Sequence, residues 1–579
     1  MIPVTFDGML GKLYLPSGPA SGLGVVVVPP HGLEALAATK SLRILADGLA
    51  AAGHAVLRYD LPGTADSLGG DGDPDRVPVW TASVATAAGM LRECAGTGGT
   101  IVLGLRFGAL IGTLGSEAIP DLAGLVLLDP VVRGRLYARE LAITARAVAE
   151  GARLDPDATS TPEGLLVGGH LTTPETLKAI GGLDLGKIPA PAAPVMILHR
   201  KGAADAAALA SVWATQTIVT AAEATGFDGI SISPTMATTP HEAFGTAIDW
   251  TETLPRRALT TPGAIGAASL SGPEFVENAI TFGEGGRLFG VFCDPVDPDP
   301  AKPAVLIVNA GRNPHVGWAR SGVDLARRLA ADGVASLRID LAGIGDGVDR
   351  PGAPDAVESV LYHPATELDT AAAIDLLAAH RPGPIVLSGA CSGAYLAFHS
   401  AARDPRIAGL VLVNIQRFVW RKGETVAEAI ASAYPLASSY VAKVWSARSW
   451  RRVLTGERKL WPLVREFARR ATSRLRAVVP SSETRRARAM MSRLQARGVR
   501  VELFFSADDP GLGDLALHFG AGGRRLANDP RIVMTLVASS DHDLTPPAAR
   551  QALFERVLAA TRAVQSSAGK QVAHGTTSA

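Results

Sequence analysis

The sequence has few cysteines, little net charge and no long apolar run. Cys94, Cys293 and Cys391 are the three cysteines among 579 residues. They are too few for a disulfide framework and their spacing fits no zinc site, so we predict neither a metal nor a cofactor. A net charge of +1 excludes a chain built as a whole to bind nucleic acid or a membrane. Apolar stretches fall short of the roughly 20 residues that span a bilayer, and the N-terminus lacks a secretory pattern, so we expect a cytoplasmic protein.

The sequence does contain an internal repeat. Residues 48–67 and 328–347 are identical at 11 of 20 positions, including Leu-Arg-x-Asp-Leu-x-Gly and a later Asp. Around both segments, short apolar strands alternate in the same order with amphipathic helices. This alternation predicts parallel sheets that are covered by helices on both faces.

The repeat predicts two tandem α/β domains, each with a mostly parallel sheet and helices on both faces. The first domain spans 1–255, and a linker rich in Pro, Gly, Ser and Ala spans 256–273. The second domain spans 274–564. We expect the last residues, 565–579, to form a disordered tail.

A strand, a sharp turn and a helix are predicted around Cys391. Gly389 and Gly393 flank it, as a turn requires in which larger side chains two residues away would collide. The turn places the thiol at a helix N-terminus, which favours the thiolate. The backbone N–H of Ser392 is then a predicted oxyanion donor.

The partners expected for this cysteine follow later strands. Asp509, preferred over Asp508, follows a strand that ends near residue 506, and His542 lies in a strand-to-helix loop. The order nucleophile, acid, histidine predicts a catalytic triad in which His542 is the general base. We expect a second oxyanion donor at Ala310 or Gly311, in the loop after an earlier strand.

The matching turn of the first domain has no nucleophile. Gly104 and Gly108 are kept, but Arg106 stands where the attacking atom belongs, and a guanidinium cannot attack a carbonyl. Asp205 and His241 are expected to mark a former acid and base. The sequence favours equally an anion-binding site at Arg106 and a degenerate domain kept for packing.

Three motifs carry a family resemblance: Leu-Arg-x-Asp-Leu-x-Gly-x-x-Asp at 57–66 and 337–346, Gly-Leu-Arg-Phe-Gly-Ala at 104–109, and Leu-Asp-Pro-Val-Val-x-Gly at 128–134. Through them the chain resembles the α/β-hydrolase superfamily. More narrowly, it resembles the serine-aminopeptidase-like hydrolases associated with exosortase and exopolysaccharide gene clusters. The resemblance implies hydrolysis or acyl transfer in polysaccharide or lipid-linked metabolism. Cysteine in place of serine is similar to dienelactone hydrolases and polyhydroxyalkanoate synthases, and favours transfer to hydroxyls or thiols.

A strongly basic segment, at about 416–500, is predicted to form a helical lid over the second site. Residues 417–500 hold 17 arginines and 3 lysines against 5 glutamates, a net charge of +15, with four tryptophans interleaved. This pattern favours an anionic acyl substrate, small or lipid-linked, or contact with an anionic membrane surface. A solvated helical face is the alternative. No nucleic-acid recognition motif accompanies the charge, so we expect no nucleic acid partner.

Three functions are compatible with these features. The leading one is hydrolysis of ester or thioester bonds through a covalent acyl-enzyme on Cys391. An acyltransferase with the same Cys391–His542–Asp509 site is the first alternative. The second alternative is a non-catalytic ligand-binding protein, for which Arg106 in the first turn is the supporting feature.

Overall fold

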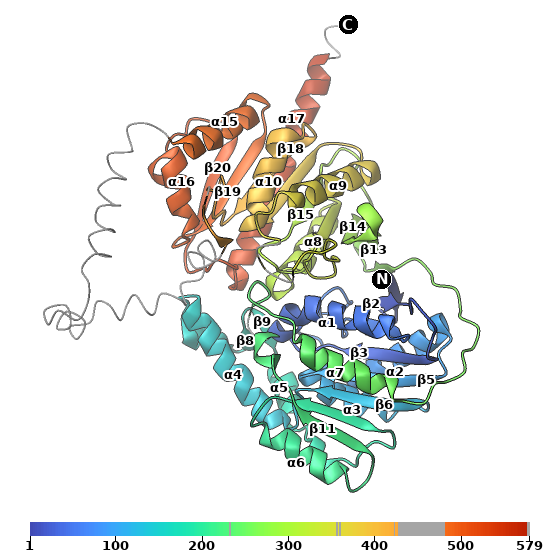
Figure 1. Cartoon of the computed structure of the whole chain (residues 1–579). Coiled ribbons are helices and arrows are strands. Elements are labelled where there is room, and N and C mark those ends of the chain that lie inside the picture. The colour runs from blue at the N-terminus through green and yellow to red at the C-terminus, as the bar shows by residue number, and fades with distance from the viewer. Residues whose placement is uncertain (231–232, 355–356, 358–359, 422, 427–480, 576–579) are drawn as a thin grey trace, which may run out of the picture. The chain divides into compact units, whose positions relative to one another are not determined.

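The structure is a computed structural model that describes residues 1–230, 233–354, 357, 360–421, 423–426 and 481–575 (Figure 1). The chain folds into two compact units. Unit 1 comprises Met1–Ala149 and Asp155–Gly383, and unit 2 comprises Glu150–Leu154 and Pro384–Ala579. Among the described helices, none combines the length and the hydropathy required to cross a bilayer.

Unit 1 contains an eight-stranded sheet with the order β1-β2-β4-β3-β5-β6-β10-β11. The pairs β1–β2 and β2–β4 are antiparallel, and the remaining pairs are parallel. The strands are β1 (Ile2–Phe6), β2 (Met9–Tyr14), β3 (Leu23–Val28), β4 (Ala55–Tyr59), β5 (Gly99–Leu105), β6 (Leu122–Leu128), β10 (Val195–His199) and β11 (Val219–Glu223).

Helices cover both faces of this sheet. In β3, Val25 and Val27 belong to one hydrophobic cluster, and Val26 and Val28 belong to another, because alternate side chains of a strand point to opposite faces. The first cluster includes residues of α1 and α7, and the second includes residues of α2, α3, α4 and α6. The helices of this part are α1 (Leu33–Ala51), α2 (Arg76–Ala95), α3 (Phe107–Ser116), α4 (Gly134–Gly151), α5 (Pro174–Gly181), α6 (Ala204–Trp213) and α7 (His241–Glu252). A small sheet of β7 (Ser160–Thr161), β8 (Gly164–Val167) and β9 (His170–Thr172) follows α4.

The rest of unit 1 begins a second series of strands. Residues 255–268 form neither helix nor strand, and the division into domains at 256–273 stays a prediction. The strands are ordered β12-β13-β14-β16-β15. The elements are β12 (Ser269–Ser271), β13 (Phe275–Phe282), β14 (Leu288–Pro295), β15 (Ala304–Val308), α8 (Ser321–Ala331), β16 (Ser336–Asp340) and α9 (Ala365–His380).

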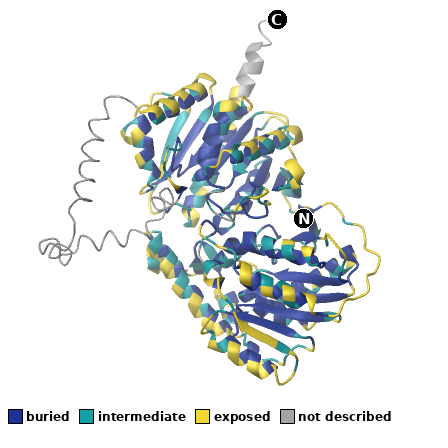
Figure 2. Cartoon of the chain, in the orientation of Figure 1, coloured by how far each residue is buried: buried dark blue, intermediate teal, exposed yellow. Residues whose placement is uncertain are grey.

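Unit 2 contains four parallel strands with the order β17-β18-β19-β20. The elements are β17 (Ile385–Ala390), α10 (Ser392–Arg403), β18 (Ile407–Val413), α15 (Ser482–Ala496), β19 (Arg500–Ser506), α16 (Gly511–Phe519), β20 (Ile532–Val537) and α17 (Pro547–Gly575). Figure 2 shows that most strands in both units are buried, as expected when helices cover a parallel sheet.

Two sequence predictions about unit 2 need comment. The predicted lid at 416–500 lies mostly outside the described residues, which omit 422 and 427–480. The predicted tail at 565–579 differs from the structure, because α17 continues as a helix to Gly575. Alanine, glutamine and lysine in this stretch are good helix formers.

Candidate functional site

Cys391 lies in a strained turn between β17 and α10. Its backbone has φ 53° and ψ −117°, a region that residues with a side chain rarely occupy. The N–H of Cys391 donates to the carbonyl of Val413 in β18 at 2.9 Å. A Cβ atom at Gly389 would lie 2.4 Å from the carbonyl oxygen of Gly393, so this position requires glycine. The turn holds the half-buried Cys391 side chain at the carboxyl end of the sheet, just before α10.

His542 and Asp509 form a buried pair in the same unit. His542 Nδ1 donates to Asp509 Oδ2 at 2.6 Å, and both side chains are at most 8% exposed. Asp509 follows β19, and His542 follows β20. The neighbouring Asp508 is exposed. The structure therefore brings together the histidine with the aspartate that the sequence analysis preferred.

Two features decide the fold. In the first sheet the antiparallel strands β1 and β2 precede a series of parallel strands, in which β4 lies before β3. A strained turn then leads from a strand into a helix, with an acid and a histidine after later strands in unit 2. The chain has the α/β-hydrolase fold.

Solved structures with this fold are similar to about half of the chain. Est1E from Butyrivibrio proteoclasticus, solved with ferulic acid, is 14% identical over 43% of this chain and 98% of its own, with a TM-score of 0.32. Proline iminopeptidase from Mycobacterium smegmatis is 18% identical over 43% of this chain and 96% of its own, with a TM-score of 0.28. A membrane phospholipase A, described as a bacterial virulence factor, is 15% identical over 50% of this chain and 87% of its own, with a TM-score of 0.30. No family model and no curated protein matches the chain.

The electrostatics of this candidate site centre on His542. Burial lowers the pKa of its imidazole, but the negative charge and hydrogen bonding of the Cys391 sulfur raise it, and so does Asp509. The net result is a pKa well above the ordinary range. A protonated ring would thus be stabilised between a carboxylate and a sulfur, which is the charge distribution of a thiolate–imidazolium pair.

Two polar residues that the sequence analysis missed support this pair. The Gln416 amide nitrogen donates to Asp509 Oδ1 at 2.8 Å and lies 3.3 Å from His542 Nδ1. Asn414 donates to the carbonyl of His542 at 2.9 Å and accepts from the N–H of Ser506 at 2.8 Å. Asn414 directly follows the apolar strand β18, and Gln416 lies two residues further on. Amide side chains close to the carboxyl end of a buried strand were the available signal.

The predicted oxyanion residues belong to different units. Ser392 is the first residue of α10, in unit 2. Ala310 and Gly311 lie in unit 1, in the loop after β15, where Gly311 has φ 57°. Asn309 fixes this loop, because its amide donates to Asn313 O and Asp340 Oδ1, both at 3.0 Å.

Arg106 occupies the equivalent turn of the first sheet, with φ 54° and ψ −118°. Its guanidinium contacts three carboxylates: Glu34 at 2.9 Å, Asp129 at 3.4 Å and Glu140 at 2.5 Å. An incoming anion would have to displace these carboxylates. The anion-binding hypothesis therefore stays a prediction that this surrounding negative charge disfavours.

The predicted remnants of a triad are not arranged like the residues of unit 2. Asp205 lies in the first turn of α6 and forms a bidentate ion pair with Arg133. His241 begins α7 and is exposed. Where Asp509 binds a histidine, Asp205 binds an arginine.

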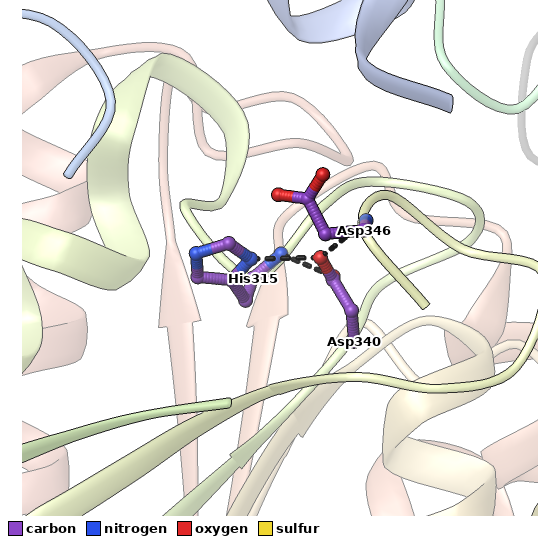
Figure 3. A group of neighbouring side chains, drawn as sticks. All are labelled: His315, Asp340 and Asp346. Carbon is purple, nitrogen blue, oxygen red and sulfur yellow. Dashed lines mark hydrogen bonds and ion pairs between the residues drawn. The ribbon is translucent and has the colours of Figure 1, made fainter. Parts of the chain in front are cut away.

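A separate group in unit 1 has the composition of a metal site. His315, Asp340 and Asp346 offer ligand atoms within 4.8 Å of one another, and all three are buried (Figure 3). However, His315 Nδ1 lies 2.8 Å from Asp340 and Nε2 lies 2.7 Å from Asp66. Because carboxylates accept hydrogen bonds, both nitrogens donate, and neither keeps a lone pair for a cation.

The same group belongs to a network of ion pairs that is balanced in charge. Its basic members are Lys12, Arg58, His315, Arg327 and Arg338, and its acidic members are Asp60, Asp66, Glu277, Asp340 and Asp346. Burial lowers the pKa of His315, but the carboxylates of Asp66 and Asp340 raise it to about 10. A protonated His315 gives five positive and five negative groups, so these residues fit a buried salt-bridge network better than a metal site.

Proposed function

We propose that the chain hydrolyses ester or thioester bonds through a covalent acyl intermediate on Cys391. The observation that carries the proposal is the 2.6 Å contact between His542 and Asp509 in the unit that holds Cys391 in a strained turn. Nucleophilic cysteines are recognised by a neighbouring base that a third group orients. Cys391, His542 and Asp509 match these roles in kind and in chain order.

The first half-reaction forms the acyl-enzyme. His542 accepts the proton of the Cys391 thiol, and the sulfur attacks as the thiolate. The sulfur attacks the carbonyl carbon and forms a tetrahedral intermediate. As the bond to the leaving oxygen or sulfur breaks, His542 gives its proton to the leaving group.

The second half-reaction releases the acyl group. His542 removes a proton from water, the hydroxide attacks the thioester carbon, and the Cys391 sulfur leaves and regains its proton. The oxyanion of both intermediates needs two donors. We assign the first to the N–H of Ser392, the first residue of α10. The second donor, at Ala310 or Gly311, stays a prediction from the sequence.

The substrate class follows from the basic segment at 416–500. Its net positive charge would attract an anionic acyl donor, such as a lipid-linked phosphate, or an anionic membrane surface. This assignment rests on the sequence, together with the family resemblance that implies polysaccharide or lipid-linked metabolism. The first half of the chain would then be a degenerate copy of the second, with Arg106 in place of the nucleophile.

The experiment that tests the proposal is a screen of p-nitrophenyl esters and acyl thioesters against the full chain. We expect turnover that Cys391→Ala abolishes, and an acyl adduct on the peptide containing Cys391 when the reaction is quenched early. Turnover by Cys391→Ala at the wild-type rate would contradict the proposal.

The same screen separates the two alternatives. An acyltransferase would accumulate an adduct that persists in water and clears when an alcohol or thiol acceptor is added. A non-catalytic protein would give no adduct with any donor. Cys391→Ser is a useful companion variant, because it keeps the turn but replaces a thiolate with a far weaker nucleophile.

A further inference from the structure

Unit 1 contains a cavity of about 80 Å³ that has no place in the proposed reaction. Its walls come from the loop before α1, from α1 itself and from residues after β4, with Val316 and Arg320 contributed by the second series of elements. At about one water per 10–15 Å³, it has room for roughly six water-sized groups. The cavity is therefore large enough for a small organic molecule.

The position of the cavity is one at which α/β sheets bind ligands. β3 ends at Val28, and the following residues Pro29 to Gly32 line the cavity. β4 ends at Tyr59, which lines it together with Asp60. Open parallel sheets bind ligands outside the carboxyl ends of their strands. The turn residue Arg106 does not line this cavity, which is thus separate from the elbow of the first sheet.

A residue that lines the cavity carries a buried polar atom with no hydrogen-bond partner among the described residues. His31 is 6% exposed and lines the cavity, and its ring packs against Trp80 and Phe107 with centroids 5.2 and 5.7 Å away. Its Nε2 lies 3.2 Å from the Thr172 hydroxyl. Among the described residues, Nδ1 has no hydrogen-bond partner. Leaving such an atom unsatisfied costs free energy, so a molecule that supplies a hydrogen-bond partner stabilises the structure.

The charged residues that line the cavity already form ion pairs or hydrogen bonds with other residues of the chain. Arg58 pairs with Asp346, and Asp60 pairs with Lys12. Arg320 donates to the carbonyl oxygens of Ala65, Ser67 and Gly69, and Asp71 pairs with Arg76. A cationic ligand would find no free carboxylate, and an anionic ligand would have to give up its hydration and compete with three carbonyl oxygens for the guanidinium of Arg320.

The remaining lining is mostly apolar. Leu36 and Leu42 of α1 and Val316 contribute hydrocarbon, and the hydroxyl of Thr39 is bound to carbonyls of its own helix. Burial, with help from the charge of Arg76, lowers the pKa of His31 to about 3, which keeps the ring neutral. A neutral imidazole nitrogen is a donor in one tautomer and an acceptor in the other. A hydroxyl group satisfies either state.

We propose that this cavity binds a small neutral alcohol, with its hydroxyl on His31 Nδ1 and its hydrocarbon against Leu36 and Leu42. This site is independent of the proposed hydrolase reaction, because its residues lie in unit 1 and the triad lies in unit 2. An alcohol of about six non-hydrogen atoms fits the available volume.

The test measures binding of 1-pentanol to the full chain by saturation-transfer NMR, with pentanoate and pentylammonium as charged probes of the same length. Wild type should bind 1-pentanol saturably and bind both ions at least about tenfold more weakly. Ala35→Leu, which fills the cavity, should abolish binding, and Ala51→Leu, at an exposed position of the same helix, should not. His31→Phe should weaken binding about tenfold, the value of one lost hydrogen bond.

Several results would overturn this assignment. Absence of saturable 1-pentanol binding would mean that the cavity holds water alone. Equal binding of pentanoate would contradict a neutral ligand, and unchanged binding by Ala35→Leu would place the alcohol elsewhere. If Ala35→Leu does not fold, Thr39→Leu fills the same cavity one turn later and gives the same comparison.

Discussion

Cys391 and Arg106 hold the same backbone conformation, with φ and ψ of 53° and −117° at Cys391 and 54° and −118° at Arg106. Each N–H donates at 2.9 Å to the carbonyl oxygen of the last residue of the neighbouring strand. The acceptor is Val413 for Cys391 and Leu128 for Arg106. The two turns therefore differ in their side chains and not in their backbones. Strain of this kind is stored at functional sites. The turn of the first sheet keeps the same strain with Arg106 in place of a cysteine.

Introducing a thiol into the first turn should not create a second reactive site. In Arg106→Cys the new side chain would face the carboxylates of Glu34 and Asp129, which disfavour a thiolate, and Asp205 would still be bound to Arg133. We expect alkylation at position 106 to be at least about tenfold slower than at Cys391 at pH 7. Mass spectrometry of the two peptides measures both rates in one sample, and equal rates would contradict this reading.

The turn at Cys391 should not tolerate a side chain at Gly389. A Cβ atom there would lie 2.4 Å from the Gly393 carbonyl oxygen, so Gly389→Ala must shift the backbone beneath Cys391. We expect a loss of about 3 kcal/mol in the free energy of unfolding, together with slower alkylation of Cys391. Denaturant unfolding measures the first effect.

Gly513→Ala is the matched control for that variant. Gly513 lies exposed in α16, and a Cβ atom there meets nothing within 4 Å. Because alanine favours a helix over glycine, we expect a gain of about 0.5–1 kcal/mol and unchanged alkylation. Similar losses in both variants would show that the predicted clash is not what destabilises Gly389→Ala.

Gln416 should act as a positioning residue for the triad. In Gln416→Leu, Asp509 loses the donor at 2.8 Å and is freer to turn away from His542. We expect alkylation of Cys391 to slow about tenfold or more, since a hydrogen bond to a charged group contributes about 1.5–3 kcal/mol. Gln495→Leu removes a 3.2 Å contact with Asp529 and serves as the control. An altered pH profile in Gln416→Leu alone would distinguish positioning from a general loss of stability.

The His315 network should make stability depend on pH in the alkaline range. The pKa of His315 is raised to about 10 in the folded chain, against about 6.5 when unfolded. Protonated His315 therefore stabilises the fold fully below pH 6.5, and this contribution is lost as the pH rises to 10. We expect the free energy of unfolding to fall by a few kcal/mol over that range.

The controls for this effect are two histidine variants. His315→Gln should remove the pH dependence and lower stability at pH 6.5, because Asp66 and Asp340 lose their shared partner. His380→Gln, at a partly exposed ion pair with Asp294, should leave the dependence in place. A wild-type stability that is flat from pH 7 to 10 would contradict a protonated His315.

The sequence was sufficient for those parts of the site that local patterns define. Gly389, Gly393 and the strand before them predicted the turn at Cys391, because the strain of the turn restricts its nearest neighbours. Asp509 and His542 were predictable because each follows a late strand, and parallel strands bring their carboxyl ends to one edge of a sheet. For Gln416 the only signal was an amide side chain shortly after a buried strand, and nothing local shows that this amide reaches Asp509.

The contacts between the two repeated segments could not be predicted from the sequence either. The repeat identified Arg58 with Arg338, but each arginine pairs with the aspartate of the other segment, Arg58 with Asp346 at 2.5 Å and Arg338 with Asp66 at 2.6 Å. Such exchange depends on how the folded segments pack, and no motif encodes it. The cavity at His31 also depends on how the folded segments pack, because residues far apart in the chain form its walls.

The most direct test of the central claim is the rate of alkylation of Cys391 against pH, followed by mass spectrometry in wild type and His542→Ala. Cys94 and Cys293 are internal references, since burial raises the pKa of both thiols. We predict that wild type reacts rapidly at pH 6.5 and that His542→Ala reacts about 10- to 100-fold more slowly, as an ordinary thiol does. Identical pH profiles in the two proteins would contradict a Cys391–His542 pair, and with it the proposed hydrolase mechanism.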